Sequence, residues 1–165
     1  MRFLLAASLK MAVDTPARIA ILGAGPIGLE AALYARYLGY DVDVYERGRV
    51  TENMLRWGHV RLFTPWQRNV SPLGVAALRA QDESWRPPPD DALLSARELV
   101  NLYYHPLAHS DLLVDSLRTH TDVMAIGRQG QLKGENAGSD ARIFADFRVL
   151  LRDGAGNERV ETADV

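Results

Sequence analysis

A glycine-rich turn between a short apolar run and a helical segment is the feature that most constrains how this chain can fold. The turn, residues 23–28 (GAGPIG), directly follows the apolar run 19–22, which has the length of a buried β-strand. A helical pattern then extends from Pro26 to Leu38 and stops at Gly39, a typical residue for a helix C-terminus. The sequence therefore predicts a strand, a tight turn and a helix in immediate succession.

A second strand and an acidic residue complete this unit. Residues 41–45 alternate in polarity as a strand does, and Glu46 follows them, 18 residues after Gly28. Strand, glycine turn, helix, strand and acid in this order are typical of dinucleotide binding. A carboxylate at this position can accept hydrogen bonds from the ribose hydroxyls of an adenosine. It also repels a 2′-phosphate, so NADP is the least favoured nucleotide at this site.

Each residue of the turn has a physical role in this interpretation. Gly23 permits the tight turn, Gly25 lets the backbone approach a pyrophosphate, and Gly28 lets helix and strand pack closely. Pro26 is tolerated because an N–H in the first helical turn has no intrahelical partner. Ile27 completes the turn, whose free N–H groups and helix dipole favour a phosphate. All five residues are predicted to bind the cofactor.

Residues 18–48 resemble the N-terminal FAD-binding motif of the flavoproteins with two dinucleotide-binding domains, which include flavin-containing monooxygenases and pyridine nucleotide-dependent flavin oxidoreductases. The family pattern is GxGxxGxxxA, followed after the second strand by Glu-Arg or Glu-Lys. The resemblance implies that the motif binds FAD, whereas NAD(P)H, the co-substrate of full-length relatives, uses a later copy. The matching residues are Gly23, Gly25, Gly28, Ala32, Glu46 and Arg47.

The resemblance implies an FAD-dependent oxidoreductase, or its N-terminal FAD-binding portion, in which the flavin carries the chemistry. The chain has no cysteine, so it lacks the redox-active pair of the disulfide reductases, and a monooxygenase-like protein is preferred. The alternative is a non-catalytic or truncated dinucleotide-binding module, with NAD as another ligand. No residue can be assigned as catalytic, the substrate is not indicated, and a cytoplasmic location is expected.

The predicted fold class is α/β, a Rossmann-like domain in which a parallel sheet carries a β-hairpin or meander. We expect a leader at residues 1–17 and the domain at 18–165, with a helical insertion at about 51–120. Residues 123–126 are predicted to form the third parallel strand, and the resemblance implies that Val123 contacts the adenine through its backbone. Residues 143–152 and 158–165 are predicted to form an antiparallel hairpin.

The resemblance also implies a parallel strand and a second nucleotide-binding domain after this hairpin. Neither is evident in the sequence, so the domain is predicted to be truncated at its C-terminus, and a partner chain could supply the missing half. The net charge of −2 with 24% charged residues predicts no general attraction to nucleic acid or to an anionic membrane.

Within the insertion, residues 57–74 have two interpretations. They form either a packed connector or a loop beside the flavin, with Arg56 or Arg61 reaching a phosphate or ribose. Trp57 and Trp66 are assigned to packing rather than to flavin stacking. Short helices are expected at 51–55 and 74–81.

A capping box at Ser95 and Glu98 predicts the start of a longer helix, which Pro106 should kink or divide. His105 and His109 are four residues apart, a spacing that can chelate a metal. No third ligand is evident and Pro106 disturbs the geometry, so no metal site is predicted.

Overall fold

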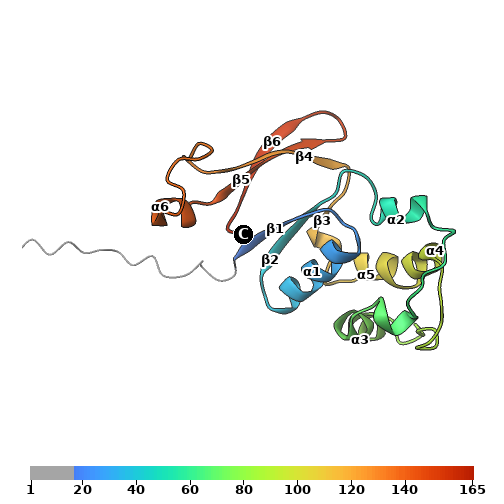
Figure 1. The fold of residues 1–165 in the computed structure, drawn as a ribbon. Helices are drawn as coiled ribbons and strands as arrows, with labels where there is room; N and C mark the ends of the chain where they lie inside the picture. Colours follow the sequence, from blue (N-terminus) through green and yellow to red (C-terminus); the bar gives the residue numbers. More distant parts are fainter. Residues whose placement is uncertain (1–16) are drawn as a thin grey trace, which may run out of the picture.

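The computed structural model describes residues 17–165 and is built around a parallel sheet that lies between a helical layer and an antiparallel meander (Figure 1). The α/β class predicted from the sequence is confirmed. The predicted leader at 1–17 lies, apart from Ala17, outside the described residues.

The predicted strand–turn–helix–strand unit is present. β1 (Arg18–Leu22) and β2 (Asp41–Tyr45) pair in parallel, from Arg18 opposite Asp41 to Leu22 opposite Tyr45. α1 (Pro26–Tyr37) connects them and ends before Gly39, whose φ of 88° is a conformation that favours glycine. These boundaries agree with the sequence prediction to within one residue at each end.

The two faces of the sheet are covered by different layers. On one face α1 packs through buried Leu29 and Leu33 within the same apolar core as Val42 and Val44 of β2. On the other face Tyr45 packs with residues of the meander, and Figure 1 shows α1 and the meander on opposite sides of the sheet. Side chains of β2 therefore contribute to two separate apolar clusters, because successive side chains of a strand point to opposite faces of the sheet.

The third parallel strand is not where the sequence predicted it. β3 consists of Leu117–Arg118, which pair in parallel with Val44 and Tyr45. The chain then turns at His120, which has a φ of 52°. Residues 123–126 lie in β4 (Thr121–Arg128), which pairs antiparallel with β5 (Phe147–Asp153). A strand of two residues gives no periodic signal, whereas the apolar run beyond the turn does, so the assignment at 123–126 was wrong.

The predicted antiparallel hairpin is present, but its first strand begins at Phe147 rather than at residue 143, and its second strand ends at Ala163 rather than at residue 165. Residues 143–146 were expected to begin a strand, but the strand begins at Phe147, because residues 140–143 form a helical turn stabilised by the Phe144 N–H to Asp140 carbonyl hydrogen bond of 2.9 Å. After the meander, Val165 exchanges hydrogen bonds with Arg18 and Ala20 of β1. The elements are β4 (Thr121–Arg128), α6 (Asp140–Ile143), β5 (Phe147–Asp153) and β6 (Glu158–Ala163).

The segment between β2 and β3 contains several short helices, and some of its residues line the candidate site on the side away from Glu46; this side is called the far wall. Its predicted capping box is present: the Ser95 hydroxyl accepts from the Glu98 N–H, and the Glu98 carboxylate accepts from the Ser95 N–H at 2.7 Å. The elements are α2 (Glu52–Arg56), η1 (Trp66–Arg68), α3 (Pro72–Gln81), α4 (Ala96–Leu99), η2 (Val100–Tyr104), α5 (His105–Ala108) and η3 (Val114–Ser116).

The helix that Pro106 was predicted to kink or divide is divided into three consecutive elements, and Pro106 lies in the first turn of the last one, α5. η2 is a π-helical turn that joins α4 to α5, so residues 96–108 remain helical throughout. Pro106 has no N–H for the carbonyl of Leu102, four residues earlier. The indole Nε1 of Trp85 donates to that carbonyl instead, at 3.0 Å.

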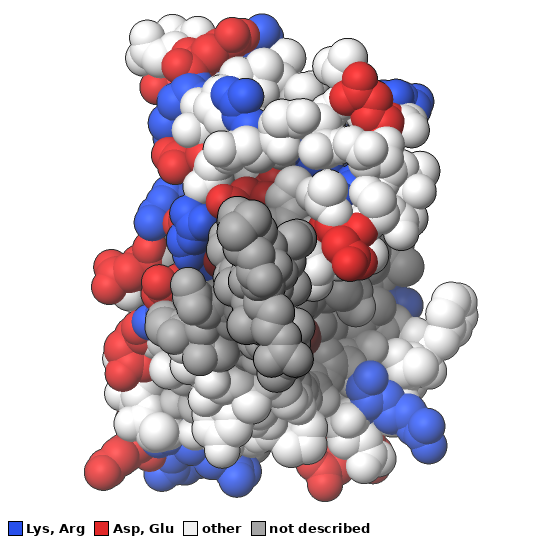
Figure 2. Space-filling model, turned by 90° about the vertical axis from the view of Figure 1, so that its left-hand side faces the viewer, with Lys and Arg blue, Asp and Glu red and all other residues white. Residues whose placement is uncertain are grey.

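Charged side chains of both signs are interspersed on the face shown in Figure 2, as a net charge of −2 would suggest. In the part of the chain that the structure describes, no helix has both the length and the apolar character needed to cross a bilayer.

Candidate dinucleotide-binding site

The glycine turn between β1 and α1 has the geometry that each glycine was predicted to supply. Gly23 has a φ of 99°, in the left-handed region. A Cβ on Gly28 would lie 1.9 Å from the carbonyl oxygen of Gly23, so only glycine allows the helix to approach the strand this closely. A Cβ on Gly25 would meet no atom within 4 Å, and its backbone is extended. The space beside Gly25 is therefore open.

Backbone donors converge on this open space. Leu29 makes the first backbone hydrogen bond of α1, to the carbonyl of Gly25 at 3.0 Å. Among residues 17–165, the N–H groups of Gly25, Ile27 and Gly28 donate to no protein acceptor. No acidic side chain lies in the first turn of the helix to compensate them. Free N–H groups at the positive end of a 12-residue helix form a favourable site for a phosphate group.

Glu46 lies at the end of β2, beside this turn. Its Oε2 accepts from the Ala24 N–H at 2.9 Å, and its Oε1 accepts from the Gly48 N–H at 2.8 Å. Each carboxylate oxygen can accept more than one hydrogen bond, so both retain capacity for a ligand hydroxyl. The carboxylate is partly buried, which holds it in one orientation.

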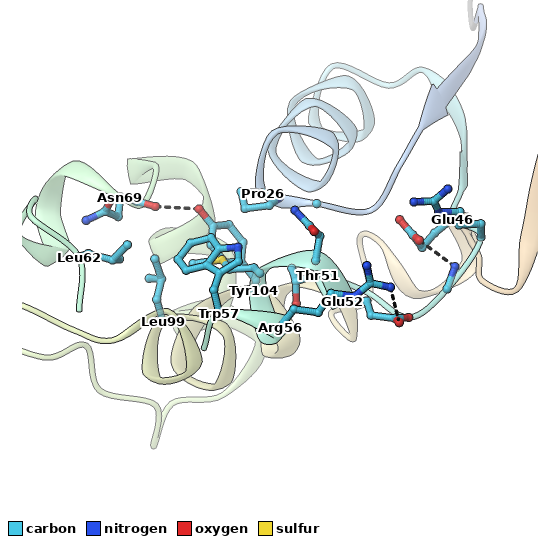
Figure 3. A pocket seen from close by; sticks show the side chains of 15 residues that line it. Pro26, Glu46, Thr51, Glu52, Arg56, Trp57, Leu62, Asn69, Leu99 and Tyr104 are labelled. Atoms are coloured by element: carbon cyan, nitrogen blue, oxygen red, sulfur yellow. Dashed lines mark hydrogen bonds and ion pairs between the residues drawn. The ribbon is translucent and has the colours of Figure 1, made fainter. Parts of the chain in front are cut away.

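A pocket of about 670 Å³ runs from Glu46 past the turn to the helical segment. Figure 3 shows Glu46 at one end, Thr51 and Glu52 in the middle, and Leu62 and Leu99 at the other end. The pocket is polar near Glu46 and aromatic or aliphatic at the far end. Its lining residues are Gly25, Pro26, Glu46, Arg47, Gly48, Thr51, Glu52, Asn53, Met54, Arg56, Trp57, Leu62, Asn69, Leu99 and Tyr104.

The far wall is fixed by a hydrogen bond between segments distant in sequence. The Tyr104 hydroxyl donates to the Asn69 carbonyl at 2.9 Å. Burial, with a smaller contribution from the negative charge of Glu30, raises the pKa of Tyr104 to about 12. Tyr104 is therefore a neutral hydrogen-bonding residue at physiological pH and is not suited to act as a base.

The predicted cofactor-binding residues fall into two groups. Four of them line the pocket: Gly25, Pro26, Glu46 and Arg47. The other four do not, although Gly23 and Gly28 shape the turn and Ile27, which is 83% exposed, stands on the first turn of α1. Val123 lies in β4 and packs against the cluster around Tyr45. A contact of any of these residues with the cofactor remains a prediction.

The arginines and tryptophans of residues 56–66 also separate. Arg56 lines the pocket and pairs with Glu52 at 3.5 Å, whereas Arg61 forms a β-bridge with Ser95 and is not part of the lining. Trp66 is 2% exposed and packs edge-on against Tyr103, so its assignment to the core is confirmed. Trp57 is 37% exposed and lines the pocket.

His105 and His109 lie side by side, with ring centroids 4.3 Å apart. Burial, followed by the neighbouring His109, lowers the pKa of His105. Within residues 17–165, no group of three or more His, Cys, Asp or Glu side chains is arranged to hold a metal ion.

One of the two interpretations of residues 57–74 placed them beside the cofactor, and Trp57, Leu62 and Asn69 do line the pocket. Sequence reasoning missed Leu99, Tyr104 and the buried Thr51, which also line it. Thr51 is 2% exposed and has a φ of 54°, an unusual conformation for a β-branched residue. Its N–H donates to the Ala24 carbonyl at 2.9 Å, which joins the loop after β2 to the glycine turn. Asn69 and Tyr104 are 35 residues apart, and no local pattern signals that they meet.

Comparison with known proteins locates the resemblance in the same unit. Residues 18–54 match the family described as pyridine nucleotide-disulphide oxidoreductase. A subunit of the NAD-dependent dihydropyrimidine dehydrogenase of Salmonella typhimurium, PreT, is 46% identical over 44 residues, which are 27% of this chain and 11% of that protein. The resemblance to FAD/NAD(P)-binding flavoproteins is thus confirmed as a partial-length match.

Solved structures share the fold over nearly the whole chain. The bacillithiol disulfide reductase Bdr (YpdA) of Bacillus cereus has a TM-score of 0.63 at 15% identity, covering 90% of this chain and 37% of its own. The complex of OTEMO with FAD and NADP has a TM-score of 0.58 at 21% identity, covering 89% of this chain and 24% of its own. At these identities the likeness shows the fold, and this chain spans well under half of either protein.

Proposed function

We propose that this chain is the FAD-binding portion of an FAD-dependent oxidoreductase, which binds the ADP part of FAD at the glycine turn. The observation that carries the proposal is the open space at Gly25, where three backbone N–H groups have no acceptor among the described residues. A diphosphate would accept hydrogen bonds from these N–H groups, and such bonds are stronger than those to a neutral acceptor because the phosphate oxygens are charged. The flavin would supply hydride or electron transfer when bound.

The remaining residues of the pocket fit the other parts of the same ligand. Glu46 and Arg47 follow one another in the chain and both line the pocket, and Glu46 is proposed to accept from the adenosine ribose. Trp57, Leu62 and Leu99 form an apolar end that suits an aromatic ring system and excludes water. Val123 is proposed to contact the adenine through its backbone.

FAD is preferred to NAD because of the elements on the C-terminal side of β3. The chain continues there into an antiparallel meander, whereas a dehydrogenase domain would add another strand–helix unit. The solved complex with FAD and NADP contains a chain of this fold. NAD(P)H is proposed as the co-substrate of a longer protein rather than as the ligand of this turn.

The monooxygenase-like branch is our preference, and it depends on the absence of cysteine from the sequence. The fold does not separate the branches, since the bacillithiol disulfide reductase shares it. A longer protein or a partner chain would supply the second nucleotide-binding domain. The relative from Salmonella typhimurium, named as a subunit of a dehydrogenase, supports the partner. We propose a cytoplasmic location for the assembly.

The second candidate is a dinucleotide-binding module without catalysis of its own. It is favoured by one observation: the Tyr104 hydroxyl in the pocket donates to the Asn69 carbonyl, and burial raises its pKa to about 12, so it stays neutral and is not suited to act as a base. Turnover of the flavin with NAD(P)H separates this candidate from the enzyme.

The test is a calorimetric titration of the purified chain with FAD, NAD and NADP. The flavin absorbance of the gel-filtered complex then shows whether FAD stays bound. Binding of FAD in preference to NAD supports the proposal, and binding of NAD with no response to FAD contradicts it. If FAD binds, oxidation of NAD(P)H by the complex indicates an enzyme, whereas its absence indicates the module.

A further inference from the structure

The carboxylate of Glu46 is already bonded to the backbone of the glycine turn. One oxygen accepts from the Ala24 N–H at 2.9 Å, and the other accepts from the Gly48 N–H at 2.8 Å. Ala24 lies between Gly23 and Gly25 and is fully buried. A side chain whose single task was to bind a ribose would not need these two bonds.

The loop that begins with Glu46 holds both peptide groups of Ala24. The N–H of Ala24 belongs to the Gly23–Ala24 peptide, which Glu46 orients. The carbonyl of Ala24 accepts from the Thr51 N–H at 2.9 Å and belongs to the same peptide plane as the Gly25 N–H. The direction of the Gly25 N–H, one of the free donors of the site, is therefore set by residues 46–51.

The turn needs such a restraint because glycine is conformationally permissive. Gly23 is in the left-handed region and Gly25 is extended, and as glycines they have no side chain that could anchor them to the rest of the protein. In the absence of external bonds, the peptide groups between them could rotate among several conformations. Amides that point at a ligand before it arrives bind it with a smaller loss of conformational entropy.

We propose that Glu46 is a positioning residue, which holds the glycine turn in its binding conformation in addition to accepting from the ribose. The role toward a ligand rests on the proposed function, whereas the bond to Ala24 is a contact within the protein itself. The two roles are compatible because each carboxylate oxygen has a second lone pair.

The variant that separates the roles is Glu46→Gln. Glutamine has nearly the same shape but replaces one acceptor oxygen by an NH₂ group, which cannot accept from a backbone N–H. Glu52→Gln is the matched control. Glu52 lines the same pocket wall and accepts from the Arg49 N–H at 2.9 Å, but it has no hydrogen bond to the turn. Both variants remove one negative charge from the pocket.

The first measurement is amide hydrogen exchange of the ligand-free chain by NMR. In Glu46→Gln, the amide of Ala24 or of Gly48 should exchange about tenfold faster or more, as expected for a lost hydrogen bond to a charged group. Glu52→Gln should leave the Ala24 amide unchanged, and amides in the middle of α1 should be unchanged in both variants. Unchanged exchange at Ala24 and Gly48 in Glu46→Gln would overturn the proposal. If that variant does not fold, Glu46→Asp, too short to reach both amides, is measured in its place.

The second measurement compares binding of ADP with that of 2′,3′-dideoxy-ADP, which lacks the ribose hydroxyls. If Glu46 positions the turn, Glu46→Gln should weaken binding of the dideoxy ligand as well, by about tenfold. Loss of a negative charge alone should strengthen binding of the anionic diphosphate, and Glu52→Gln reports that effect. If Glu46→Gln kept the full affinity for dideoxy-ADP, the ribose contact would be the one role left for Glu46, and the positioning role would be refuted. If the wild-type chain binds no ADP, the proposed function fails, and the exchange measurement still decides whether Glu46 holds the turn.

Discussion

Two glycines of the same turn should respond to substitution in opposite ways, and the structure gives the expected size of each effect. Gly25→Val should abolish dinucleotide binding while leaving the chain folded. A Cβ at Gly25 meets nothing within 4 Å, and the φ of −80° there is accessible to any residue. The folding cost is that of replacing glycine at a helix N-cap, about 1 kcal/mol or less, partly offset by the lower entropy of the unfolded chain.

The effect on binding is expected to be much larger. The valine side chain would occupy the space in which a diphosphate meets the N–H groups of Gly25, Ile27 and Gly28. A hydrogen bond between an amide and a charged group contributes about 1.5–3 kcal/mol, so the loss of even one bond should weaken binding by about 10- to 150-fold. The loss of all three would place affinity below the range of calorimetry.

Gly28→Ala is the matched substitution, with the added atom directed into the protein. Its Cβ would lie 1.9 Å from the Gly23 carbonyl oxygen and 3.5 Å from the Ile21 side chain. The strand and the helix must separate to relieve the first contact, at a cost typical of overpacking, about 1–3 kcal/mol. For a chain of 165 residues this lowers the melting temperature by about 2–12 °C.

Thermal unfolding by circular dichroism and titration with FAD test the pair. Gly25→Val should melt within a few degrees of the wild-type chain and fail to bind, whereas Gly28→Ala should melt clearly lower. Wild-type affinity in Gly25→Val would show that the ligand lies elsewhere. A large loss of stability in Gly25→Val would show that the space beside Gly25 is required by the protein and not by a ligand.

Three further predictions concern stability. Tyr103→Phe removes the hydroxyl that donates to Oε1 of Glu30, whose Oε2 is buried without a partner among the described residues. The free energy of unfolding, measured in urea, should fall by about 1–3 kcal/mol. Tyr104→Phe removes one neutral bond and should lower it less, so equal losses in the two variants would contradict this. Burial raises the pKa of Tyr45 and of Tyr104 to about 12 from 10.0. In alkali the native state therefore binds more protons than the unfolded state, so the stability that these residues contribute is complete below pH 10 and is lost as the pH rises toward 12. Urea unfolding from about pH 8 to 11.5 should show this decline. Ser95→Ala removes the capping box and should cost about 0.5–2 kcal/mol; an unchanged urea midpoint would show that the cap adds nothing to packing.

The half of the site next to the glycine turn could be predicted from the sequence because its signals are local. Strand, turn, helix and strand occupy residues 18–45 without interruption, and each glycine has a steric reason that the structure reproduces. Glu46 was found by its distance from the turn. Its bonds to Ala24 and Gly48 were not predicted, since sequence spacing places a carboxylate but does not say what it contacts.

The other half of the site could be predicted only in part: residues 57–74 were one of its candidates, but Leu99 and Tyr104 join it through contacts between distant segments. The short strand β3 illustrates the same difficulty: Leu117 and Arg118 are a strand because they pair with Val44 and Tyr45. Two residues have no periodicity of their own. The apolar run after His120 resembled a parallel strand in sequence, yet its partner is β5, so only the pairing distinguishes the two assignments.

Pro106 shows that a local rule can hold while the contacts around it stay hidden from the sequence. A proline inside a helix removes a donor and crowds the preceding turn, which predicts a kink or a division. Here the preceding turn is π-helical, and Trp85, 17 residues before Leu102, donates to the Leu102 carbonyl, to which Pro106 has no N–H to donate. The π turn also precedes α5 directly and contains Tyr103 and Tyr104, of which the first bonds to α1 and the second lines the pocket. Pro106 and part of the pocket wall therefore lie in one helical segment. Trp85→Phe keeps an aromatic ring but removes the indole donor at a residue outside the pocket lining; it should speed amide hydrogen exchange at Tyr103 and Tyr104, and unchanged exchange there would show that the indole bond does not hold this wall.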